Sequence, residues 1–302
     1  MRKKGTIIIR LIALLVVAFY VVACDFTEDC SFKGPVKVYI DYSNIDSELR
    51  SQIPDSMQTN IAFVSREYSA NTSFHRLWSN PLYLSKVVGE YDVLYYSMCG
   101  NREILNIQDP FMAVISSPTY FLPDGRKSIS AEEKPLFSAD PQGVIVEEKD
   151  STELYFSARP VGKYIIMHMK VEHLNTGKIL TCTGTLEGVS TSYRISDAVI
   201  GKENVTVRFN MTDKDVPVNY DLTRRLSVPG IHKGTNNCNF SLTFSNATPI
   251  SLDIDFTDVL KKAERDVIIL YISADLSPVS PSIGIDKWED KDWDDIGKFE
   301  AQ

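Results

Sequence analysis

Hydrophobic and polar residues alternate along most of this chain, and a repeat of two residues is the pattern of β-strands. From residue 36 to residue 42, apolar or aromatic side chains alternate with Lys37, Tyr39 and Asp41. This alternation is typical of a strand that buries one face against a core. The pattern recurs over residues 205–212 and 250–256. Further strands are predicted at residues 60–65, 91–98, 111–116, 143–147, 164–171, 180–186, 240–244 and 267–273.

Helical periodicity is almost absent, so the sequence predicts an all-β protein built from two-layer antiparallel sandwiches. About 280 residues follow the N-terminal apolar segment, which suits two domains of roughly 100 to 150 residues each. A polar stretch between Pro123 and Pro141 indicates a long connection. We therefore predict an N-terminal β-sandwich at residues 34–148 and a C-terminal β-sandwich at residues 149–277.

Two local features differ from the strand pattern near the C-terminus. One short helix is predicted at residues 257–262, with Thr257 as its N-cap. Residues 278–302 form an acidic tail that contains Trp288 and Trp293. This tail is either a final edge strand followed by a solvated end or a segment that binds a partner.

The N-terminal segment predicts where the mature protein begins. A basic start is followed by an apolar run at residues 11–23 and then by Cys24, an order that resembles the signal peptide and lipobox of bacterial lipoproteins. We expect residues 1–23 to be a signal peptide, Cys24 to carry the lipid, palmitate included, and residues 24–33 to form a tether. A membrane-spanning anchor is the alternative, but the run is shorter than the roughly 20 residues of a span, and Arg10 interrupts its extension.

Charge and composition exclude some classes of partner. The formal net charge is −8 and the isoelectric point is about 5.1. Nucleic-acid binding requires a basic face that neutralises phosphates, so we expect no nucleic-acid partner. The overall composition is close to the globular average, which predicts folded domains.

The sequence contains no recognisable catalytic or metal-binding constellation. Its histidines are His75, His168, His173 and His232. The only close pair, His168 and His173, would point to opposite faces of a strand and cannot share a metal. His168 has the parity opposite to its apolar neighbours, so we expect it to face solvent. The acidic tail matches a calcium loop only weakly, because no glycine stands at the turn position. We expect no enzyme activity, no cofactor and no metal.

The cysteines suggest a covalent crosslink. With Cys24 assigned to lipid, Cys30, Cys99, Cys182 and Cys238 remain, an even number that permits up to two disulfides in an exported protein. The parity of their apolar neighbours places Cys182 and Cys238 in the core of the second domain, so this pair is the expected disulfide. The alternative is that both are buried free thiols that behave as small hydrophobic residues.

The strand order and five short segments resemble the fimbrillin-type lipoproteins of Bacteroidales, in the minor-subunit and anchor branch or a sister family beside it. The segments are CDFTEDC at residues 24–30, VKVYIDY at 36–42, GEYDVL at 89–94, FTDV at 256–259 and IDKWED at 285–290. The resemblance implies two transthyretin-like β-sandwich domains, a lipid anchor in the cell outer membrane, and a role in the fimbrium or in cell adhesion. In such pili a neighbouring subunit donates a strand into an open groove, and this chain would be the acceptor.

Two functions follow as expectations. The first is an outer-membrane-anchored lipoprotein with a structural or adhesive role, which anchors or assembles a fimbria by accepting a donor strand from a fimbrial subunit. The alternative is a surface module that binds a glycan or a protein, with Trp78, Trp288 and Trp293 as a contact platform. Acidic residues directly after Cys24 fit either an export signal or a polar tether, so surface and periplasmic orientations both stay open.

Overall fold

The computed structural model of the chain is almost entirely β, which confirms the predicted all-β sandwich class. It describes residues 32–43, 45, 59–67, 72–77, 79–97, 101–172, 178–214, 216, 219–245, 248–277 and 280–291. The predictions for Cys24, Trp78 and Trp293 lie outside these residues. Within these ranges, no helix is long and apolar enough to cross a bilayer.

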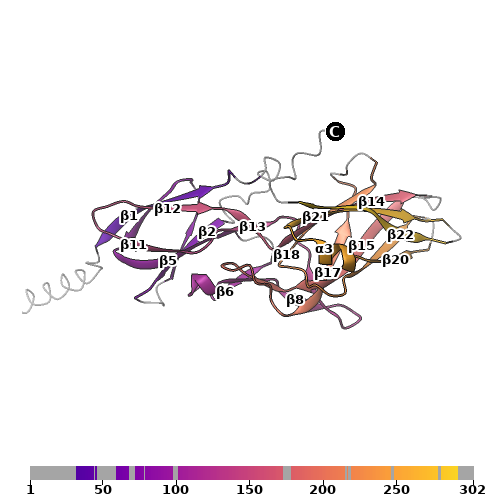
Figure 1. Cartoon of the computed structure of the whole chain (residues 1–302), viewed down its shortest axis with the longest axis horizontal. Helices are drawn as coiled ribbons and strands as arrows, with labels where there is room; N and C mark the ends of the chain where they lie inside the picture. Colours follow the sequence, from indigo (N-terminus) through magenta and orange to yellow (C-terminus); the bar gives the residue numbers. More distant parts are fainter. Residues whose placement is uncertain are drawn as a thin grey trace, which may run out of the picture.

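The first sandwich packs sheet A onto sheet B (Figure 1). Sheet A contains, in spatial order, β12 (Thr152–Ser157), β1 (Lys33–Asp41) and β4 (Leu82–Val87). Sheet B contains β13 (Arg159–Val161), β10 (Leu136–Ser138), β5 (Gly89–Ser97), β2 (Thr59–Ser65) and β3 (Thr72–Arg76), and β11 (Gln142–Val146) also pairs with β5. Fully buried rings of Phe63, Tyr95 and Phe156 lie in the core between the two sheets.

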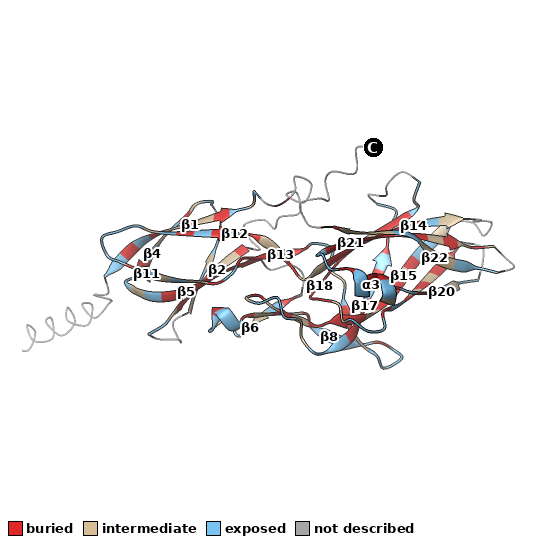
Figure 2. Ribbon diagram, in the orientation of Figure 1, coloured by how far each residue is buried: buried red, intermediate tan, exposed pale blue. Residues whose placement is uncertain are grey.

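The second sandwich packs sheet D onto sheet E. Sheet D contains β20 (Ile250–Asp255), β19 (Asn237–Phe244), β15 (Ile179–Ser190), β17 (Asn204–Met211), β9 (Lys127–Ser130) and β8 (Thr119–Phe121). Sheet E contains β18 (Leu222–Val228), β14 (Lys163–Glu172), β21 (Val267–Asp275) and β22 (Ser282–Lys291). Phe209, Phe240 and Leu270 lie in its core, and buried and exposed residues alternate along the strands (Figure 2).

A small third layer covers the outer face of sheet B. Sheet C contains β16 (Ser192–Arg194), β7 (Val114–Ser116) and β6 (Glu103–Leu105), and the 3-10 helix η1 (Pro110–Met112) precedes β7. Ile115 and Tyr193 of sheet C pack with Leu94 and Tyr96 of β5 in a separate apolar cluster. Sheet C therefore buries a face of sheet B that would otherwise be exposed.

Strand pairing is mixed and not wholly antiparallel as expected. β1 pairs with β12, β14 with β21, and β17 with β9 in parallel, whereas the other strand pairs are antiparallel. Parallel neighbours cannot be joined by a hairpin, because the chain must cross over before it returns in the same direction. Long-range crossovers thus complete both sandwiches.

The two sandwiches exchange strands across the predicted boundary at residue 148. β12 and β13 follow that boundary but pair with β1 and β10 of the first sandwich, whereas β8 and β9 precede it and belong to sheet D. Tyr164 and Ile166 of β14 and Val267 and Ile269 of β21 pack into the first core. Hence one cut in the sequence does not separate the two sandwiches.

Two local expectations need correction. The helix α3 spans Thr257–Lys262 as predicted, but Phe256 is its N-cap residue and makes no side-chain cap. The Thr257 hydroxyl instead accepts a hydrogen bond from the backbone N of Asn236 at 2.9 Å. His168 has the predicted parity, yet its side chain is buried and not solvent-facing, because the rings of Tyr220 and Tyr271 cover it.

Candidate functional site

The outward face of sheet D carries short polar side chains arranged in rows across the strands. Thr185 of β15 lies opposite Asn239 of β19, which in turn lies opposite Asp253 of β20. On the other side of β15, Thr185 lies opposite Arg208 of β17. Alternation fixes this arrangement, since the intervening residues of each strand point into the core. The row presents hydroxyl, amide, carboxylate and guanidinium groups on one surface.

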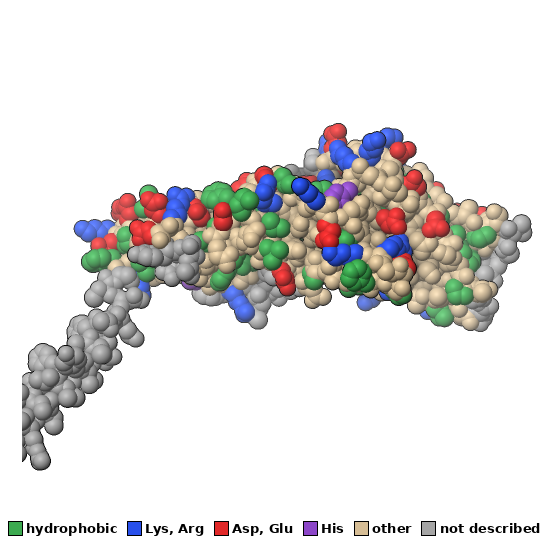
Figure 3. Space-filling view, turned by 90° about the horizontal axis from the view of Figure 1, so that it is seen from below, with side chains coloured by type: hydrophobic (Ala, Val, Ile, Leu, Met, Phe, Trp, Pro, Cys, Tyr) green, Lys and Arg blue, Asp and Glu red, His purple; other side chains and the backbone are tan. Residues whose placement is uncertain are grey.

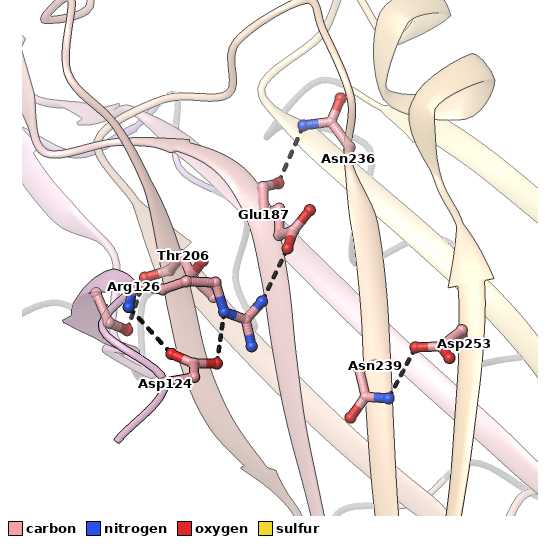
Figure 4. Close-up of polar contacts among 8 residues, drawn as sticks. Asp124, Arg126, Glu187, Thr206, Asn236, Asn239 and Asp253 are labelled. Carbon is pink, nitrogen blue, oxygen red and sulfur yellow. Dashed lines mark hydrogen bonds and ion pairs between the residues drawn. The ribbon is translucent and has the colours of Figure 1, made fainter. Parts of the chain in front are cut away.

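Part of this face is hollowed into a polar groove of about 600 Å³. Figure 4 shows two polar pairs at its sides: Arg126 with Glu187, and Asn239 with Asp253. The groove is lined by Arg126, Thr185, Glu187, Asn237, Asn239, Asp253, Ile254 and Asp255. The β8–β9 turn supplies Arg126, and strands β15, β19 and β20 supply the other residues.

Hydrogen bonds hold the charged groups of the groove in place. Arg126 donates from Nε to Asp124 Oδ2 at 2.7 Å and from Nη1 to Glu187 Oε1 at 2.8 Å. The backbone N–H and the side chain of Arg126 both hold the pKa of Asp124 below its ordinary value. Hydrogen bonds from Thr257 likewise lower the pKa of Asp255. These carboxylates are therefore ionised at neutral pH.

The chemistry of the groove suits a hydroxylated ligand. Asn239 Nδ2 donates to both Ser251 Oγ and Asp253 Oδ1 at 2.8 Å, which leaves its carbonyl oxygen as an acceptor. Amides and carboxylates on a rigid sheet can donate to and accept from ligand hydroxyls without much loss of side-chain entropy. No histidine or cysteine lines the groove. Across the part of the chain that the structure describes, no group of three potential ligands could hold a metal ion.

The expected disulfide between Cys182 and Cys238 is wrong. Both side chains are buried in the second core, as their parity predicted, but both thiols are free. Cys182 lies opposite Leu242, and Cys238 lies opposite Leu186. The two cysteines are thus four residues out of register on neighbouring strands, and at about 3.3 Å per residue this offset exceeds the reach of a disulfide. Burial raises the pKa of the Cys182 thiol to about 12, so the thiol stays protonated.

The side chain of Trp288 packs on the hydrophobic core and does not form the exposed contact platform that the sequence suggested. It lies on the edge strand β22 opposite Leu270, is half-buried, and packs against the second core. Residues 282–291 of the predicted tail thus form an edge strand of sheet E, which is the first of the two alternatives for this segment. The remainder of the tail lies outside the described residues.

Exposed tyrosines on sheet A were not foreseen as a surface feature. The rings of Tyr39 and Tyr155 stack at 4.6 Å between centroids, and Tyr83 on β4 is 64% exposed. Lys37 pairs with Glu153 at 3.3 Å beside them. A hydrogen bond to Glu153 raises the pKa of Tyr155 to about 12. The only signal in the sequence is the polar parity of the predicted strand at 36–42, which does not reveal that strand's neighbours.

Acidic and basic side chains are interspersed with hydrophobic ones over the face shown in Figure 3. This face carries no large patch of a single sign.

Comparison with known proteins identifies similar folds. No protein-family model and no curated protein matches the sequence. A "putative adhesin" from Bacteroides ovatus ATCC 8483 superposes with a TM-score of 0.56 at 12% identity, over 84% of this chain and 93% of that chain. A structure from Bacteroides thetaiotaomicron VPI-5482, described as "putative polysaccharide binding proteins", gives a TM-score of 0.52 at 10% identity, over 84% and 96%. At these identities the likeness shows that this chain shares the fold of those Bacteroides proteins.

Proposed function

We propose that this protein is a lipid-anchored surface lipoprotein with a structural or adhesive role. The observation that carries the proposal is the position of β1, which begins at one end of the long axis while the second sandwich lies at the other (Figure 1). Cys24 precedes Lys33 by nine residues, a tether of about 30 Å at full extension. A lipid on Cys24 would hold the first sandwich near the membrane and display the second sandwich away from it. The adhesin-like fold supports the same role.

The anchor can be tested directly. Cells that make the full chain are labelled with an alkyne fatty acid, and Cys24→Ser is compared with Cys99→Ser. We expect labelling to be lost only in Cys24→Ser, and protease treatment of intact cells then reports whether the protein faces outward. Unchanged labelling of Cys24→Ser contradicts the lipid anchor.

In finer detail, we propose that the protein anchors or assembles a fimbria by accepting a donor strand along β4. β4 is an edge of sheet A, which has three strands against the six of sheet B, so an added strand would widen the narrower sheet. On the other edge, β12, Gln142 Nε2 donates to the mid-strand carbonyl of Tyr155 at 2.7 Å, whereas on β4 the Tyr91 hydroxyl donates to the carbonyl of the last residue, Val87, at 2.9 Å. Backbone hydrogen bonds along β4 would provide affinity, and side-chain pockets would set the register.

The edge of sheet E fits a donor strand less well. On β22, Glu289 pairs with both Lys287 and Lys291, and the pairing of β22 with β21 contains a bulge near Tyr271. Charges and bulges on an edge strand discourage pairing with another chain. β4 also carries a charge, Lys86, whose Nζ lies 5.0 Å from the centroid of the Phe63 ring, but its pairing with β1 contains no register shift.

Site-directed crosslinking tests the donor strand. A benzophenone amino acid replaces Tyr83 on β4 or, as the matched control, Tyr155 on β12, since these two rings are 64% and 60% exposed. The full chain is irradiated in its native membranes and recovered in mild detergent, and attached proteins are identified by mass spectrometry. We expect a fimbrial shaft subunit from position 83 and none from position 155. The absence of a fimbrial subunit at both positions refutes donor-strand acceptance by sheet A.

The polar groove of sheet D favours a second function, saccharide binding by a protein with no catalytic activity. Asn239→Ala and Asp253→Ala remove the central amide and carboxylate of the groove. Thr243→Ala lies on the same strand as Asn239 but outside the groove and is the control. We expect the two groove variants alone to lose binding on an oligosaccharide array. Undiminished binding by both contradicts the groove as the site.

A further inference from the structure

Two adjoining cavities lie beside β8 and β9. They lie at the end of the polar row on sheet D, where Arg208 follows Thr185. They share Tyr120 and Ser130 and have volumes of about 240 and 260 Å³. Together they fall within the usual size range of ligand pockets. We call them the arginine cleft, because Arg102 lines one cavity and Arg208 and Arg224 line the other.

The cleft contains buried polar atoms that lack a partner among the described residues. Arg224 of β18 has a side chain only 11% exposed, and its Nη1 bonds to Glu133, yet its buried Nε has no hydrogen-bond partner in the described structure. In the neighbouring cavity, the buried Ser117 hydroxyl is likewise unsatisfied by any described residue. Buried donors in folded proteins are nearly always satisfied, so each of these atoms indicates a place where a ligand or a water molecule accepts a hydrogen bond.

The charges of the cleft favour a single anionic group. Arg208 and Arg224 line one cavity, where Arg224 pairs with Glu133. Arg102 lies with Glu132 in the other cavity, and its Nη1 and Nη2 donate to Ser227. Glu132 already accepts from the backbone N of Asn101 at 3.2 Å. The balance is therefore positive on a chain whose formal net charge is −8. Guanidinium Nε and Nη donors form a planar fork that matches a carboxylate.

Tyr120 supplies an aromatic surface beside the arginine side chains of the cleft. Its ring lines both cavities and is 37% exposed, and its hydroxyl donates to the Ile129 carbonyl at 3.4 Å. A ring fixed at one end can stack on the apolar face of a sugar. Asn101 and Asn210, one in each cavity, offer amides to sugar hydroxyls.

We propose that the arginine cleft binds the carboxylate of an acidic saccharide, with Arg208 and Arg224 on the carboxylate and Tyr120 against the sugar ring. The inference rests on the proposed saccharide function and deepens it by naming the ligand class. Arg208 lies next to Thr185 in register, so one oligosaccharide can place its hydroxyls in the groove and its carboxylate in the cleft.

Carboxyl-reduced ligands give a matched test. Calorimetry on the full mature chain compares oligogalacturonate, glucuronate-containing and sialylated oligosaccharides with the same oligosaccharides after reduction of each carboxylate to an alcohol. We expect the acidic forms to bind at least about tenfold more tightly, the loss that follows removal of a charge-assisted hydrogen bond. Arg208→Gln and Tyr120→Ala should each abolish most of that preference. Arg66→Gln, the same charge change on the first sandwich, should leave it intact.

The outcomes separate the inference from the function on which it rests. Equal binding of acidic and reduced ligands, lost in Asn239→Ala, overturns the arginine cleft and keeps the groove. No binding of any member of the panel overturns both. An acidic preference that persists in Arg208→Gln and Tyr120→Ala also overturns the cleft as its source.

Discussion

Protonation of His168 should destabilise the second sandwich. This side chain lies on β14 between the rings of Tyr220 and Tyr271, at 5.6 and 5.5 Å between centroids. Its Nδ1 is 3.1 Å from the Thr223 hydroxyl. Burial, assisted by the positive charge of Arg225 and opposed by Glu289, lowers the pKa of His168 from 6.5 to about 4. The folded protein thus holds the neutral imidazole.

The size of this loss in the free energy of unfolding follows from the difference in the pKa of His168 between the folded and unfolded chains. The gap between 6.5 in the unfolded chain and about 4 in the fold corresponds to about 3 kcal/mol at 1.36 kcal/mol per pKa unit. Between these two values the unfolded chain binds more protons than the folded chain, so stability falls as the pH falls. The penalty is absent above about pH 6.5 and complete below about pH 4.

His168→Phe isolates this contribution, because phenylalanine keeps a ring between the two tyrosines and cannot be protonated. Urea unfolding of the mature chain with Cys24→Ser is followed by tryptophan fluorescence at about pH 7 and about pH 4. We expect the parent to lose about 3 kcal/mol more than the variant between these conditions. Carboxylates and His75 titrate in both proteins and cancel in the difference. Parallel losses in the two proteins would refute the burial argument.

Three further predictions concern the second sandwich. Gly184→Val should cost about 1–3 kcal/mol in urea unfolding, because a Cβ there would lie 2.2 Å from the Phe209 ring. Asp255→Ala should lower the urea midpoint in the same assay, because the Asp255 carboxylate accepts a hydrogen bond from the Thr257 N–H at 2.8 Å at the start of α3. Alkylation of the unfolded, unreduced protein should modify both Cys182 and Cys238 completely, as measured by mass spectrometry, because both thiols are free. If both residues stay unmodified, the two cysteines form a disulfide after all.

The alternation of apolar and polar residues predicts where strands lie, but it does not predict which strands pair with one another. Every predicted strand overlaps an observed one, and residues 164–171 and 267–273 fall inside β14 and β21. Local alternation reports one buried face, which is a property of a single strand. The parallel pairing of β1 with β12 joins residues more than a hundred positions apart, and nothing in either segment specifies it. Pairing depends on which crossovers close the core.

Some strands escaped detection because their patterns are weak. β18 contains Arg224 and Arg225 at its centre, a pair that hides the apolar alternation around it. Residues 111–116 were predicted as one strand, but the Asp109 side chain accepts from the Phe111 N–H at 3.2 Å and starts η1 at Pro110. Side-chain caps and an N1 proline override strand propensity over such short distances.

The binding surfaces were harder to predict than the strands, since each one gathers residues from several segments. The arginine cleft takes Tyr120 from β8, Arg208 from β17 and Arg224 from β18. Each residue alone reads as an ordinary surface position in its strand. The packing of sheet D on sheet E brings them together, and the unsatisfied Arg224 Nε and Ser117 hydroxyl among the described residues mark the place. Sequence patterns cannot reveal an unsatisfied donor.

Sheet E joins the two sandwiches because its two faces pack in different hydrophobic cores. Its inner face packs in the second core, while Ile166, Val267 and Ile269 on its outer face pack in the first. Burial of such side chains stabilises by roughly 1.5–3 kcal/mol each, so separating the sandwiches would expose several of them at once. A shared sheet resists bending at the junction far better than a flexible linker does. A tether on the first sandwich would therefore set the orientation of the groove and the arginine cleft on the second.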